Sequence, residues 1–291
     1  MSETTEIAKQ DWNLVIRPKR GLFDLQLGEV WRYRDLILLL VRRDFVSVYK
    51  QTVLGPAWFF IQPLLSTIVF YFTFGVAAGM DTGPLPPLLF FMSGQVGWGY
   101  FADCMNKTSA TFTANAGIFG KVYFPRLVTP ISIVMSSVIK FGVQLLVFLG
   151  FWTYFYSTTD TMRPNMMLLF FPVLVLMMAG MGLGFGIIIS SLTTKYRDFQ
   201  FLIQFGLRLL MFISPVVLYL PGIKERSELM YNVIRLNPMT SVIETLRYGF
   251  CGGEWTVGWM DVGYSATLTV VSIIVGVILF TKVEKNFMDT V

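Results

Sequence analysis

The sequence predicts an all-α integral membrane protein with six transmembrane helices, an amphipathic interface helix before them, and short re-entrant helices between spans five and six. Two observations support this fold class. Hydrophobic residues make up 54% of the 291 residues and charged residues only 14%, whereas a soluble domain carries about a quarter charged residues. Six segments of roughly the length needed to cross a bilayer, about 20 residues, contain few charges.

The N-terminal part is expected to form a cytoplasmic tail over residues 1–27 and an amphipathic cytoplasmic interface helix over residues 28–53. In the second segment apolar residues recur at spacings of three and four, as one buried helix face requires. Its longest apolar run is too short to cross a bilayer. From residue 51 to residue 80 no side chain is charged, so the interface helix leads directly into a membrane span.

Residues 54–291 are expected to form the six-span domain. The spans are the stretches over which about 20 residues pass with few charges, and they are residues 54–78, 86–104, 128–156, 166–192, 199–220 and 262–281. Between the last two lie two amphipathic pieces, residues 229–234 and 239–250, that are too short to span. Such interrupted pieces beside a full span are typical of re-entrant or interfacial helices.

The basic residues predict that both termini are cytoplasmic. Of 23 lysines and arginines, 16 fall in segments that this assignment places on one side of the membrane, as cytoplasmic loops require. The net charge of +5 therefore follows the membrane faces and does not indicate nucleic acid as a partner.

The junction between the interface helix and the first span carries a recognisable pattern. At the junction the pattern consists of Arg34-Asp35, Tyr49 to Trp58 (Tyr-Lys-Gln-Thr-Val-Leu-Gly-Pro-Ala-Trp) and Gln62-Pro63. Further matches later in the chain are Ser214-Pro215-Val216, Asn237-Pro238-Met239, Glu244 and Arg247. Over about residues 28–288 the chain resembles the membrane (permease) subunit of type-2 ABC exporters for bacterial cell-surface polysaccharides. The pattern does not separate O-antigen, capsule and teichoic acid exporters.

The resemblance implies a half-transporter of the bacterial inner membrane. A homodimer would form the channel, and two copies of an ATP-binding cassette ATPase would bind beneath it. ATP and magnesium would bind to that ATPase, so no cofactor is expected on this chain. The substrate would be an undecaprenyl-linked glycan taken from the cytoplasmic leaflet, with membrane lipids as the remaining partners.

No catalytic residue and no metal site is expected. The chain has no histidine, and its acidic residues are scattered, whereas a membrane-embedded glycosyl- or phosphotransferase needs carboxylates gathered at one face. That enzyme, and a type-2 exporter of a drug or other small molecule, are the alternatives to polysaccharide export. Glycines 180, 182, 184 and 186 lie inside the fourth span, where small residues allow helices to approach closely.

Two sets of residues are candidates for contacts at the cytoplasmic face. The polar segment 107–125 is expected to couple the chain to the ATPase, with a plain solvated loop as the alternative; the candidates are Thr108, Ala110, Phe112, Asn115 and Phe119. Guanidinium groups pair bidentately with phosphates. The candidates for the carrier's head group are therefore Arg32, Arg34, Arg42 and Arg43, with anchoring to anionic lipids as the simpler interpretation.

Two further sets concern the translocation path. Lys140 lies inside a span, where a lipid-facing charge costs about 2.5–3.5 kcal/mol, so it is expected to line a polar channel or to pair with an acid at a span end. Because sugars stack on aromatic rings, Trp98, Tyr100 and Phe101 are also channel candidates, although core packing is the simpler interpretation. The outer gate candidates are Asn237, Pro238 and Arg247.

Overall fold

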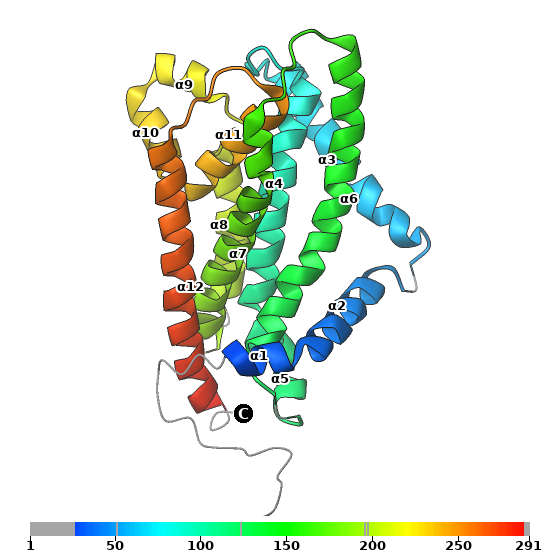
Figure 1. Ribbon diagram of the computed structural model, residues 1–291, viewed down its shortest axis with the longest axis vertical. Helices are drawn as coiled ribbons and strands as arrows, with labels where there is room; N and C mark the ends of the chain where they lie inside the picture. The colour runs from blue at the N-terminus through cyan, green and yellow to red at the C-terminus, as the bar shows by residue number, and fades with distance from the viewer. Residues whose placement is uncertain (1–26, 51, 123, 195, 197, 288–291) are drawn as a thin grey trace, which may run out of the picture.

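The computed structural model describes residues 27–50, 52–122, 124–194, 196 and 198–287, and every regular element within these ranges is helical. Figure 1 shows a bundle of long helices with α1, α2 and α5 at one end, here called the α5 end, and α9 and α10 at the other, the α9 end. The last turns of α12 also lie at the α5 end. The expected tail, residues 1–27, lies outside the described residues apart from Leu27.

The interface helix expected over residues 28–53 is divided in two and is shorter than predicted. It consists of α1 (Leu27–Arg32) and α2 (Arg34–Tyr49), with Tyr33 between them. A short 3₁₀ turn, η2 (Gly55–Ala57), follows. Gly55 has a φ of 50°, a left-handed conformation that glycine adopts without steric cost. This turn reverses the chain from α2 into α3, as Figure 1 shows.

Within the part of the chain that the structure describes, four helical segments are long and apolar enough to cross a membrane. They are α3 (Trp58–Phe70) with its π-helical continuation η3 (Tyr71–Ala77), α6 (Val128–Thr158), η4 (Met166–Phe170) with α7 (Phe171–Thr193), and α12 (Trp259–Phe287). They correspond to the first, third, fourth and sixth expected spans. The protein is therefore a multi-pass membrane protein.

The other two expected spans differ from this group. α4 (Pro87–Ser109) has 23 residues, about 35 Å at 1.5 Å per residue, but it is less apolar. α8 (Phe199–Phe212) is apolar but has only 14 residues. The expectation that this helix continues to residue 220 is wrong, because the chain turns at Ser214 and Pro215, and proline lacks the N–H that a continuing helix requires. Six spans therefore remain a prediction.

The segment after α8 contains three short helices. They are α9 (Leu220–Arg226), α10 (Glu228–Leu236) and α11 (Pro238–Cys251), and the last two correspond to the two amphipathic pieces expected there. The side-chain oxygen of Asn237 accepts a hydrogen bond from the backbone N–H of Met239 at 3.0 Å, with Pro238 in the first turn. This is a favourable helix start. Whether α10 and α11 are re-entrant stays a prediction.

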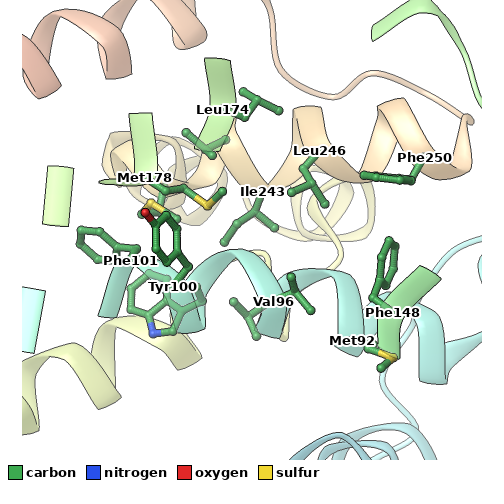
Figure 2. Packing of buried hydrophobic residues seen from close by; sticks show 14 of the residues in the cluster. Met92, Val96, Tyr100, Phe101, Phe148, Leu174, Met178, Ile243, Leu246 and Phe250 are labelled. Carbon is green, nitrogen blue, oxygen red and sulfur yellow. The ribbon is translucent and has the colours of Figure 1, made fainter. Parts of the chain in front are cut away.

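The main core lies between α4, α7 and α11. Figure 2 shows Val96, Tyr100 and Phe101 of α4 on the side that faces Met178 of α7 and Ile243 of α11. All five side chains are buried. Because most of α11 is buried in this way, it belongs to the interior of the bundle despite its short length.

The glycines of α7 bring neighbouring helices into close contact, as the sequence predicts. A Cβ atom on Gly182 would lie 2.5 Å from the Cβ of Cys104, and one on Gly186 would lie 2.6 Å from the Cβ of Thr108, both on α4. Gly180 and Gly184 approach α12 in the same way. Any side chain at these positions would force the helices apart, so α7 is packed tightly against α4 on one face and α12 on another.

Candidate translocation and coupling sites

The α5 end contains a second core that several elements share. The helix α5 (Thr111–Phe119) directs Phe112 against Phe280 of α12, with ring centroids 4.4 Å apart. The backbone N–H of Phe112 donates to Ser190 Oγ of α7 at 3.4 Å. Val30 and Ile37, from α1 and α2, belong to the same cluster. α5 and the interface helices therefore share one apolar cluster.

This packing changes which residues of α5 are available to a partner. Thr108, Phe112, Asn115 and Phe119 are buried, and Ala110 is half-buried, so four of the five coupling candidates contact helices of this chain. These candidates are therefore turned toward the interior of this chain. The exposed face of this segment consists of the residues Thr113, Ala114, Gly117, Ile118, Lys121 and Val122. Coupling through this segment stays a prediction, now assigned to that face.

The four head-group candidates lie on the surface of the interface helices. Arg32, Arg34, Arg42 and Arg43 are all exposed. Arg43 pairs with the adjacent Asp44, with Nη2 and Oδ1 2.7 Å apart. Exposed pairs of this kind contribute at most about 1 kcal/mol, so the pair does not hold Arg43 away from another anion. Contact with a lipid carrier stays a prediction.

A polar cavity of about 190 Å³ lies between α3, α4, α6 and α8. The polar side chains that line it are Gln62, Ser66, Thr67, Gln95, Lys140 and Gln144. Trp98 and the backbone of Gly99 form part of its wall. Of the four predicted channel residues, the structure therefore brings Lys140 and Trp98 to one cavity.

Lys140 is also paired with an acid near a span end, which was the alternative expectation for it. Its Nζ lies 3.4 Å from Oδ1 of Asp103 on α4. The other carboxylate oxygen of Asp103 accepts hydrogen bonds from Ser137 Oγ at 2.8 Å and Lys107 Nζ at 2.7 Å. Two ammonium groups around one carboxylate leave a net positive charge beside the cavity.

Tyr100 and Phe101 are packed in the interior and do not line this cavity. Their exposed fractions are 2% and 4%. The Tyr100 ring lies against Phe141, with centroids 4.8 Å apart. Tyr100 and Phe101 both appear among the core side chains in Figure 2. For these two residues the structure shows the core packing that was the simpler interpretation.

At the α9 end Arg247 is buried and ties three segments together. It forms an ion pair with Glu244 of its own helix. Its Nη2 donates to the Pro215 carbonyl at 2.6 Å and its Nε to Ser93 Oγ of α4 at 3.2 Å. Its guanidinium carbon stands 3.8 Å from the centroid of the Phe90 ring. In this conformation Arg247 fastens α11 to α4 and to the turn after α8.

The other two gate candidates define where α11 starts. Asn237 caps the helix and Pro238 lies in its first turn. The Nδ2 of Asn237 is buried and has no hydrogen-bond partner among the described residues. Nearby, Arg235 of α10 donates from Nε to Oδ1 of Asp261 at 3.1 Å, and this hydrogen bond raises the pKa of Arg235. A gating role for these residues stays a prediction.

Several residues of these sites are not among the candidates that the sequence predicted. Gln62 of α3 and Gln144 of α6 meet at the cavity only through helix packing, and Ser137 of α6 reaches Asp103 of α4 in the same way. A polar side chain within an apolar span was the available signal, because such residues usually face a bundle interior or a water-filled path. No group of three or more histidine, cysteine, aspartate or glutamate side chains suited to a metal occurs among the described residues.

Comparison with known proteins identifies the family. Residues 35–251 match the ABC-2 type transporter family, which covers most of the chain. This chain belongs to the ABC-2 type transporters.

Three similar proteins align over most of their length. An O-antigen export system permease protein RfbA of Klebsiella pneumoniae is 27% identical over 88% of this chain and 94% of its own length. The RfbA protein of Myxococcus xanthus is 28% identical over 74% and 80%. The polysialic acid transport protein KpsM of Escherichia coli is 22% identical over 86% and 94%.

Proposed function

We propose that this ABC-2 type transporter chain is the transmembrane subunit of an ATP-driven exporter that carries a lipid-linked polysaccharide out of the bacterial cytoplasm. The cargo is of the O-antigen, capsule or teichoic acid type. The observation that carries the proposal is the alignment with RfbA and KpsM, which covers 94% of a Klebsiella RfbA and of KpsM.

The chain is proposed to act as a homodimer. Arg208 and Gln204 are exposed on α8, between the exposed rings of Phe201 and Phe205. A charged side chain at the centre of a lipid-facing span is costly. A second copy facing α8 across a water-filled path would remove that cost, because the polar groups would face water and the aromatic rings would face the partner.

The α5 end is proposed to be cytoplasmic, since the exposed arginines of α1 and α2 lie there and basic residues concentrate on the cytoplasmic side. Two copies of an ATP-binding cassette ATPase would dock on the exposed face of α5, around Ile118, and would bind ATP and magnesium. Movement of α5 would pass to α2 through their shared core. The arginines would meet the pyrophosphate of an undecaprenyl carrier.

Purification in a mild detergent, with the mass of the intact complex measured, tests this proposal. Two copies of this chain with two copies of an ATPase are expected. A deletion strain should also lose its surface polysaccharide and regain it when the gene is returned. A chain recovered without an ATPase, from membranes whose other ABC transporters remain assembled, would contradict the proposal.

A further inference from the structure

The polar cavity contains more hydrogen-bonding capacity than this chain uses. Gln62 of α3, Gln95 of α4 and Gln144 of α6 line it from three helices. The Nε2 of Gln95 is buried and has no hydrogen-bond partner among the described residues. A buried donor that is left without a partner destabilises the fold. An amide donor without a partner, beside a wall with six polar side chains, therefore indicates a polar occupant.

We propose that this cavity binds one sugar residue of the passing polysaccharide, through the amides of Gln62, Gln95 and Gln144. This inference rests on the proposed function, and it adds a defined glycan-binding position within this subunit. Sugar hydroxyls both donate and accept hydrogen bonds, and so does a glutamine amide. Lipid acyl chains do neither, so the amides distinguish a glycan from the surrounding membrane.

The charge and the shape of the cavity narrow the ligand further. Lys140 has three donors, and Asp103 takes up one of them at 3.4 Å, so donors remain for a hydroxyl or carboxylate. The excess of lysine over carboxylate favours a neutral or acidic sugar over a basic one. The volume of about 190 Å³ is below the roughly 300–1,000 Å³ of sites for drug-sized ligands, which suits a single residue.

The position of Gly99 keeps the cavity open. It lies in the wall, and a Cβ atom there would meet only Gln144 Oε1, at 3.5 Å. That distance is an ordinary contact, so a small side chain at this position would project into the cavity without disturbing the backbone. Both Gln144 and Gly99 are therefore suitable positions for a reporter group.

Cysteine labelling tests the inference. The variant Gln144→Cys is treated with a cationic methanethiosulfonate reagent in membranes from cells that assemble the lipid-linked polysaccharide and from cells lacking the glycosyltransferase that starts it. The two native cysteines are buried, Cys104 and Cys251 with 0% and 1% exposed, so they contribute little background. The matched control is Ser157→Cys, an exposed position near the end of the same helix and outside the cavity.

We expect Gln144→Cys to react rapidly without the glycan and several-fold more slowly with it, while Ser157→Cys reacts equally in both membranes. Gly99→Cys should show the same protection, and it serves if Gln144→Cys does not fold. Equal, rapid labelling in both membranes would show that no sugar enters, and slow labelling in both would show that the cavity is dry; either result overturns the inference.

The export assay separates this inference from the proposed function. If the unmodified gene restores surface polysaccharide but neither cysteine is protected, only the sugar-binding position is wrong. If the unmodified gene restores none, the proposed function itself fails.

Discussion

The two ends of the bundle differ in where their main charged side chains lie. At the α5 end the arginines of α1 and α2 are exposed, and the interior is an apolar cluster that includes Phe112 and Phe280. At the α9 end the charges of Glu244 and Arg247 are inside, with Arg247 held by Pro215 and Ser93. The α5 end is held together mainly by apolar packing, with the buried Arg126 over the Phe119 ring, and the α9 end by a directional polar network.

This difference determines how freely each end can rearrange. Apolar contacts are non-directional, so the helices at the α5 end can shift against one another and remain in contact. A buried ion pair is destabilised strongly when one partner is lost, so the α9 end has few alternative arrangements. We therefore expect the helices at the α5 end to move while the α9 end stays fixed.

The largest effect is expected from Arg247→Met. This change leaves Glu244 buried without its partner, and such a loss costs about 3–5 kcal/mol. Unfolding in mixed detergent micelles measures it. The control is Arg235→Gln, whose pair with Asp261 is 35% exposed on the arginine side and should cost at most about 1 kcal/mol. Equal losses in the two variants would remove the distinction between buried and exposed pairs.

The next largest effect is expected from Phe112→Ala at the opposite end. Removing a buried phenyl ring costs about 3 kcal/mol, and the loss should separate α5 from α2 and α12. Proteolysis near α5 in the ATPase complex measures that separation, alongside the unfolding free energy. Phe72→Ala, at an exposed ring, is the control and should leave both readings near wild type. Unchanged proteolysis in Phe112→Ala would argue against a shared core.

A smaller effect is expected from Gly186→Val, which tests the connection between the two ends. Its Cβ would lie 2.6 Å from Thr108, and overpacking of this kind costs about 1–3 kcal/mol. Gly142→Val is the control, because a Cβ there meets nothing within 4 Å. The ratio of export to ATP hydrolysis should fall in Gly186→Val alone; an unaltered ratio would mean that α7 need not pack tightly against α4.

The smallest effect on stability is expected from Ile118→Asp. Ile118 is 39% exposed, and exposed substitutions usually change stability by less than about 0.5 kcal/mol. The ATPase should nevertheless dissociate from the complex, because a charge would enter the docking face. Met166→Asp, exposed on η4, is the control and should retain the ATPase. Retention by both variants would exclude Ile118 from the interface.

The sequence predicted those elements whose boundaries coincide with changes in polarity. α6 begins at Val128, as expected, because charged and turn residues precede an apolar run. The end of α8 was missed because Val216, Val217 and Leu218 continue the apolar pattern beyond Pro215. Hydropathy reflects burial and not helical structure. These residues are not helical, because they lie in a turn in the protein interior.

The site residues were predictable only where local sequence was sufficient. Lys140 was identified because a charge inside a span needs an explanation, but its partner Asp103 is 37 positions away and on another helix. For α5 the sequence did not distinguish the inner from the outer face, since small and apolar residues occur all around the helix. Likewise the spacing of Glu244 and Arg247 shows that they can pair, but only the packing of α11 shows that the pair is buried.

The glycines of α7 have a mechanical consequence. Gly182 and Gly186 place α7 against α4, while Gly180 and Gly184 place it against α12. Closely packed protein interiors have low compressibility and transmit strain. The three helices therefore behave as one stiff unit: a displacement at the α5 end tilts α4, α7 and α12 together about the α9 end and does not separate them.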